Sequence, residues 1–150
     1  MNFLLHHHLA ARDLGSPEAA VGAMLPDLWR MADRRVRAVR ARAAPVTIPG
    51  ETRLCEVLAG IDHHLSADRW FHAADVFLDG ERRAGELLRD ARVTAPRIQL
   101  FAHVLWELCL DGELIRREGI AAVLAALRDG FGRVQGEAAD RAADLHHFEE

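Results

Sequence analysis

The chain contains 150 residues, of which half are hydrophobic, and its formal net charge is −4. This composition excludes a disordered chain, and the length fits a single domain, residues 1–150, with its own hydrophobic core. The mild negative charge gives no electrostatic reason to bind nucleic acid, and no apolar run reaches the roughly 20 residues that span a bilayer. Because neither lysine nor tyrosine occurs, any acid–base or nucleophilic chemistry must use other side chains or a metal.

The N-terminal third is predicted to form helices interrupted by proline. Residues 2–12 fit a short first helix, and the opening lacks the basic leader and long apolar core of a signal peptide, so we expect a cytoplasmic protein. The Ser16-Pro17 pair is typical of a helix start, with serine as N-cap and proline at the first helical position. The Pro26-Asp27 pair interrupts this helix, and an arginine-rich helix is expected to follow to about Ala43.

The rest of the chain is predicted to be a loop followed by further helices. Two prolines and a glycine favour a loop over residues 44–50. Turn dipeptides at Asp79-Gly80 and Asp111-Gly112 are predicted to end helices, and beyond the loop no stretch alternates as a half-buried strand does. These patterns predict an all-α bundle of about six or seven helices. The helices expected in this part span residues 51–78, 81–92, 94–110, 113–129 and 133–147.

A row of metal-binding side chains continues the apolar stripe of the long predicted helix. His64, Asp68 and His72 are four residues apart, so they lie on one helix face, and Val57 and Ile61 precede them on the same stripe. Burial of such groups is costly unless each is paired or bound to a metal. The row therefore predicts metal ligands.

A second predicted helix repeats this spacing with His103, Glu107 and Asp111. Two helices that each present imidazole and carboxylate groups can face each other across a bundle core and share a metal. Imidazole suits Zn, Mn, Fe or Ni, and carboxylates favour the harder ions. The residues expected to form the apolar side of this helix are Leu100, Phe101, Val104, Leu105 and Leu108.

A simpler interpretation of both rows is a set of ion pairs on solvated helix faces. Asp68 would then pair with a neighbouring histidine of its own row, and Glu107 with His103. Taken alone, His6 and His8 are also best interpreted as surface residues, although they point to different helix faces. Asp27 taken alone is best interpreted as a helix-capping carboxylate.

Four short motifs occur in order along the first three-quarters of the chain. The first is an opening Met-Asn-Phe-Leu segment with two histidines two residues apart and then Leu-Ala, and the second is a Gly-x-x-Leu-x-Asp segment. The third is a Gly-Ile segment with a histidine and an aspartate four apart. The fourth, Trp106-Glu107, is similar to a Trp-Asp pair that has an acid three residues before the Trp. The matching residues are Met1, Asn2, Phe3, Leu4, His6, His8, Leu9 and Ala10, then Gly22, Leu25 and Asp27, then Gly60, Ile61, His64 and Asp68, and finally Trp106 and Glu107. Together these motifs resemble the acyl carrier protein phosphodiesterase family.

The resemblance implies a helical, HD-like fold and a metal-dependent phosphodiesterase that removes the phosphopantetheine arm from acyl carrier protein. It implies Mn as the metal, with Zn or Fe as other candidates. It also implies that His6, His8, Asp27, His64 and Asp68 belong to the active site, with Asp27 and Asp68 as its catalytic residues.

The chain departs from the family pattern at three positions. Asp62 stands where the family has histidine, His72 stands where it has aspartate, and His103 replaces an acid. Such a changed ligand set implies another metal, another substrate or lost activity. The resemblance therefore implies the family's fold and metal site for this chain more strongly than it implies the family's substrate.

Our leading hypothesis is a metal-dependent hydrolase acting on a phosphodiester. Acyl carrier protein, docked on the arginines from Arg30 to Arg42, or a small phosphodiester would be the substrate. Two alternatives remain open: a non-enzymatic metal-binding or redox bundle with a closed coordination sphere, and a degenerate family member that acts as an interaction module. The expected metal ligands are His64, Asp68, His72, His103 and Glu107, with His6, His8 and Asp27 completing or orienting the site.

Overall fold

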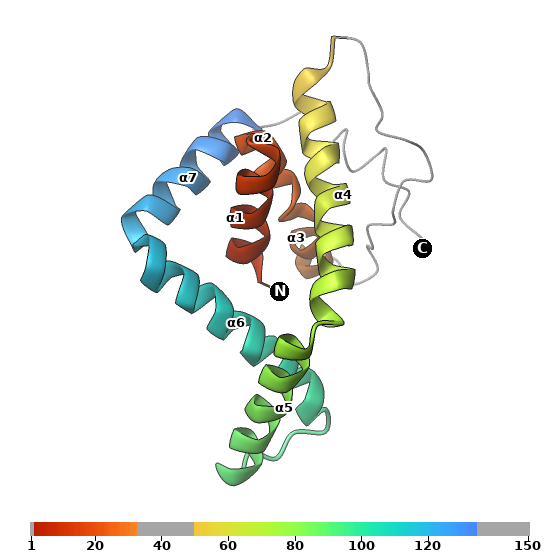
Figure 1. Cartoon of the computed structure of the whole chain (residues 1–150), viewed down its shortest axis with the longest axis vertical. Coiled ribbons are helices and arrows are strands. Elements are labelled where there is room, and N and C mark those ends of the chain that lie inside the picture. The colour runs from red at the N-terminus through yellow and green to blue at the C-terminus, as the bar shows by residue number, and fades with distance from the viewer. Residues whose placement is uncertain (1, 33–49, 135–150) are drawn as a thin grey trace.

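The computed structural model describes residues 2–32 and 50–134, and these form seven α-helices without a strand (Figure 1). The predicted all-α architecture of six or seven helices is thereby confirmed. The loop predicted at 44–50, the arginine-rich helix beyond residue 32 and the last predicted helix fall almost entirely outside the described residues. The helices are α1 (Phe3–Leu14), α2 (Pro17–Gly22), α3 (Leu25–Ala32), α4 (Thr52–His72), α5 (Asp75–Asp90), α6 (Ile98–Glu118) and α7 (Ile120–Arg133).

The main core lies where α2 packs against α4 and α1 (Figure 1). Two glycines allow the close approach of α2 and α4. A Cβ on Gly22 would overlap the Val57 carbonyl, and a Cβ on Gly60 would overlap the Ala19 carbonyl. The buried side chains of this core are Val21, Leu25, Leu54, Val57, Ile61 and Val134.

A second, smaller core holds α5 against α6. Ala84, Leu88 and Ala102 form its centre. The α5–α6 pair extends away from α1 and α2, and α6 then runs back towards α7 (Figure 1). The candidate site described below lies between the two cores, where α4 and α6 come together.

Several predicted helix boundaries are wrong because turn dipeptides serve other purposes. The long helix ends at His72 rather than residue 78, and Asp79-Gly80 lies inside α5. Gly80 is needed there because a Cβ would overlap the Trp106 ring. The Asp111-Gly112 pair lies inside α6, which continues to Glu118, and the chain turns at Gly119 with a φ of 83°.

The prediction for the apolar side of α6 is also wrong in part. Leu100, Phe101 and Leu108 are each about half exposed, with relative accessibilities of 55%, 47% and 53%. The buried side of α6 instead carries two carboxylates, Glu107 and Asp111. These face the N-terminus of α1 and the candidate site, so tertiary contacts override the pattern of leucines.

Within residues 2–32 and 50–134, none of the helices combines the length and apolar character needed to cross a bilayer.

Candidate metal centre

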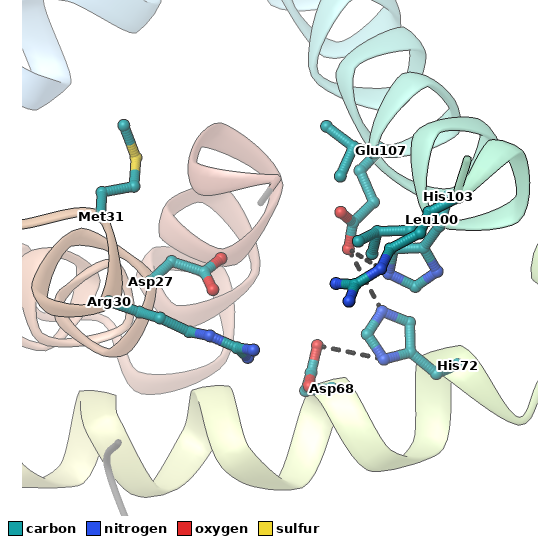
Figure 2. Close-up of a pocket in the computed structure, with 10 residues that line it drawn as sticks. Asp27, Arg30, Met31, Asp68, His72, Leu100, His103 and Glu107 are labelled. Carbon is teal, nitrogen blue, oxygen red and sulfur yellow. Dashed lines mark hydrogen bonds and ion pairs between the residues drawn. The ribbon is translucent and has the colours of Figure 1, made fainter. Parts of the chain in front are cut away.

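Ionisable side chains from α3, α4 and α6 line a cavity of about 660 Å³ (Figure 2). Several lining residues are exposed, so solvent can enter the cavity. Its histidines and carboxylates come from Asp27 on α3, from Asp68 and His72 on α4, and from His103 and Glu107 on α6. The cavity therefore joins both rows of residues predicted from the sequence.

A first ligand group consists of His6, Asp27 and His64, which come from α1, α3 and α4. One ligand atom from each lies within 4.8 Å of the other two. The His6 and His64 rings are tilted by 34° to each other with their centroids 3.9 Å apart, and both side chains are buried. Three sequence-distant segments thus bring one potential metal site together.

His64 is held in the tautomer and charge state that a metal ligand requires. Its Nδ1 donates a hydrogen bond of 2.8 Å to the carbonyl oxygen of Ala23. Because a carbonyl can only accept, the proton sits on Nδ1, and the lone pair of Nε2 faces away from that bond. Burial, followed by repulsion from His6, lowers the pKa of His64 to about 4. The ring is therefore neutral at pH 7.

The environment of His6 indicates whether a cation fits this group. Both of its ring nitrogens are buried, and among the residues that the structure describes neither has a hydrogen-bond partner. Its Nε2 lies 3.7 Å from Asp68 Oδ1, which is longer than a hydrogen bond. A buried imidazole without partners is costly, and a cation bound between His6, Asp27 and His64 would satisfy it.

A second ligand group consists of His72, His103 and Glu107. Glu107 Oε1 lies 3.2 Å from His72 Nε2 and 3.3 Å from His103 Nε2, as the dashed lines in Figure 2 show. A cation about 2.1 Å from each ligand would separate neighbouring ligand atoms by about 2.9–3.4 Å. The observed spacings therefore fit a bound cation.

Neighbouring side chains orient the imidazoles of this second group. The ring of Phe77, which is almost fully buried, lies 4.7 Å from the His72 ring and 5.2 Å from the His103 ring. Glu81 Oε2 lies 3.7 Å from His103 Nδ1, on the side away from Glu107. Carboxylates that face the outer nitrogen of a ligand histidine commonly fix its orientation.

Asp68 lies between the two ligand groups. Its Oδ1 is 3.7 Å from His6 Nε2 in the first group and 3.4 Å from His72 Nδ1 in the second. Burial opposes ionisation of Asp68, but the surrounding histidines outweigh burial, and the pKa of its carboxyl group is lowered. Asp68 is therefore an ionised carboxylate that lies close enough to interact with a histidine of either group.

Without a metal, the second group is held together by the contact between His72 and Glu107. Its hydrogen bond to Glu107 raises the pKa of His72, against the effect of burial. Burial disfavours the Glu107 carboxylate, yet the pKa of Glu107 is lowered overall, and its hydrogen bond with His72 is the largest cause of that lowering. Because a protonated imidazole cannot bind a metal, the raised pKa of His72 makes protons stronger competitors of a cation in this group.

Asp111, the third member of the second row, holds α1 in place. Its two carboxylate oxygens accept hydrogen bonds from the backbone N–H groups of Leu4 and Leu5, at 3.2 and 2.9 Å. These N–H groups belong to the first turn of α1, where helical partners are missing and negative charge is favourable. Asp111 thus positions the helix that carries His6.

The structure brings seven of the eight predicted ligands together: His6, Asp27, His64, Asp68, His72, His103 and Glu107. His8 is the exception, because it lines a separate, mainly apolar hollow with Leu4, Leu114 and Val123. The interpretation as solvated ion pairs does not fit His64 and Glu107, whose relative accessibilities are 4% and 2%.

The residues that support the ligands carry no recognisable signal in the sequence. Glu81 follows a predicted turn, and no spacing rule connects it to His103. The Ala23 carbonyl carries no side-chain signal at all, and the capping role of Asp111 depends on a contact between residues more than 100 positions apart. No protein-family model, curated protein or solved structure matches the chain, so its function must be inferred from this site.

Proposed function

We propose that the chain is a metal-dependent hydrolase that cleaves a phosphodiester, as its resemblance to the acyl carrier protein phosphodiesterase family implies. The main support is the meeting of two histidine–carboxylate groups at Asp68, on the wall of a cavity open to solvent. A purely structural metal site is usually closed by protein ligands, whereas a catalytic one keeps a position for water and substrate. This arrangement therefore favours catalysis over a storage or redox bundle.

The chain's own residues would divide the work of hydrolysis. His6, Asp27 and His64 would hold one cation, and His72, His103 and Glu107 a second. The cations would act as Lewis acids on the phosphoryl group and make water more acidic. Asp68, ionised and half exposed, would accept the proton of the attacking water. That water would form a new P–O bond as one P–O ester bond breaks, and the departing alkoxide would take up the proton that Asp68 had accepted.

We propose Mn as the physiological metal, on the strength of the resemblance. A mixed set of imidazoles and carboxylates also suits Zn or Fe. The substrate would be acyl carrier protein or a small phosphodiester in the cytoplasm. Arg30, which belongs to the arginine stretch expected to dock an acidic partner, lines the cavity. The rest of that stretch lies outside the described residues.

The first test is elemental analysis of the purified protein after incubation with Mn, Zn or Fe. Wild type should retain one or two metal ions per chain. The His64→Ala, Asp68→Ala double variant and the isosteric Glu107→Gln variant should each lose bound metal. His63→Ala is the matched control, because His63 is adjacent in sequence but pairs with Asp13 on the exposed side of α4. Circular dichroism would verify that each variant is folded.

Activity is then measured with the Mn-loaded protein on bis(p-nitrophenyl) phosphate and on acyl carrier protein that carries its phosphopantetheine arm. Turnover that depends on Mn and is lost in Glu107→Gln would support the proposal. Metal retention without turnover of either substrate would favour the non-enzymatic metal-binding bundle. A wild-type protein that retains no metal would favour a degenerate family member.

A further inference from the structure

Two arginines line the cavity together with the ligand groups. Arg30 comes from the last turn of α3, and Arg97 is the residue immediately before α6. Figure 2 shows the Arg30 side chain extending from α3 into the space between Asp27 and Asp68. The cavity is therefore bordered by positive charge from α3 and from the residue that precedes α6.

Neither guanidinium forms an ion pair or hydrogen bond within residues 2–32 and 50–134. Other arginines do so with carboxylates close by on their own helices, as Arg82 does with Glu86 and Arg116 with Glu113. Asp68 stands in the same cavity, yet it contacts the histidines instead. Arg30 and Arg97 therefore keep their hydrogen-bond donors available for a molecule that enters the cavity.

The remaining lining residues add an apolar part to the same cavity. Met31, Leu100 and Val104 contribute it, from α3 and α6. An inorganic ion would use only the charged part, and the volume of about 660 Å³ is in the range of sites for organic ligands. The cavity thus combines side chains that could hold cations beside a phosphoryl group, arginines that match its negative charge, and apolar residues that suit an attached organic group.

We infer that Arg30 and Arg97 form an anion clamp that binds the non-bridging oxygens of an organic phosphate ester, with its organic group against Met31, Leu100 and Val104. A guanidinium matches phosphate oxygens with two parallel N–H donors and remains charged at every physiological pH. This inference rests on the proposed function, because the ligand groups would hold the cations that the same phosphoryl group contacts.

The clamp is tested by titrating inorganic phosphate into Mn-loaded protein by calorimetry. Arg30→Gln and Arg97→Gln should each weaken phosphate binding about tenfold, and the double variant about a hundredfold. Bound Mn should be unchanged in all three. Arg30→Lys should recover only part of the affinity, because an ammonium group lacks the paired donors. The control is Arg128→Gln, which changes an exposed arginine on α7, a helix that contributes nothing to this cavity.

Kinetics provide a second readout on bis(p-nitrophenyl) phosphate. The arginine variants should raise KM while metal content stays at the wild-type level. If the double variant retains full metal and binds phosphate as wild type does, the clamp is refuted and the metal-dependent hydrolase still stands. If wild type retains no metal, the proposed function fails and this inference fails with it.

Discussion

At the scale of single residues, the site depends on histidines in contrasting environments. Burial keeps His64 neutral, whereas a carboxylate partner raises the pKa of His72. His64 is ready to bind a cation at neutral pH, whereas at His72 protons compete with the cation more strongly than at an ordinary histidine. Metal binding should therefore weaken as the pH falls, and the second ligand group should lose its cation first.

The environment of His64 predicts how the stability of the metal-free protein depends on pH. Its pKa is about 4 in the folded state and 6.5 as a model value, so between these values the unfolded state binds more protons. The free energy of unfolding should fall as pH drops from 6.5 to 4, by on the order of 3 kcal/mol from this group. His72 contributes with the opposite sign, because its stabilisation is complete below 6.5 and is lost as pH rises through its folded pKa.

Urea unfolding in the presence of a chelator, at several pH values from 4 to 7, measures this dependence. His64→Asn is the informative variant, since its amide can still donate to the Ala23 carbonyl but does not titrate. The variant should lose most of the fall in stability between pH 6.5 and 4. If the free energy of unfolding of His64→Asn depends on pH as that of wild type does, groups other than His64 cause the fall between pH 6.5 and 4.

At the scale of helices, the position of the ligands depends on how closely α2 and α4 approach. Gly60 lies on the stretch of α4 that leads to His64, against the backbone of Ala19 on α2. Ala23, whose carbonyl orients His64, follows directly after α2. A change in the spacing between these helices would therefore disturb both packing and the first ligand group.

Substitution of two glycines should have opposite effects on stability. Gly60→Ala should destabilise the protein by about 1–3 kcal/mol, because the new Cβ overlaps α2 and forces the helices apart. Gly112→Ala, inside α6 with nothing within 4 Å of the added Cβ, should stabilise it by up to about 1 kcal/mol. Chemical denaturation of both variants measures these effects. If Gly60→Ala does not change the free energy of unfolding, the close approach of α2 and α4 does not require a glycine at this position.

Local sequence patterns predicted helices well but their ends poorly. The four-residue spacing of His64, Asp68 and His72 reports one helix face, so that row was predictable from geometry within a single element. Asp79-Gly80 and Asp111-Gly112 have the composition of turns, yet Gly80 makes room for Trp106 and Asp111 caps α1. Both roles depend on partners distant in sequence, which no local pattern contains.

At the scale of the whole molecule, the second ligand group connects parts of the chain that have separate cores. The first core includes α4, and the second holds α5 against α6. His72 at the end of α4 and Glu107 on α6 are in direct contact between them. Which helices would be neighbours could not be predicted from the sequence, although the all-α class could, because neighbour choice depends on these long-range polar contacts.

A cation bound by residues of both parts should stabilise the folded chain. At a free Mn concentration of 100 times the dissociation constant, each site should add about 2.7 kcal/mol to the free energy of unfolding. Thermal unfolding with increasing Mn measures this effect, and Glu107→Gln should lose the increment that belongs to the second group. A melting temperature that does not change with Mn in wild type would contradict the two ligand groups as metal sites.

The cap that Asp111 places on α1 also has a consequence for the order of assembly. Its hydrogen bonds to Leu4 and Leu5 link residues separated by 107 and 106 positions. During synthesis, α1 leaves the ribosome before α6, so the first turn of α1 lacks the Asp111 cap until α6 has been made. Until α6 docks, the helix that carries His6 lacks this anchor, and we expect the first ligand group to be held less firmly in the nascent N-terminal half than in the folded chain.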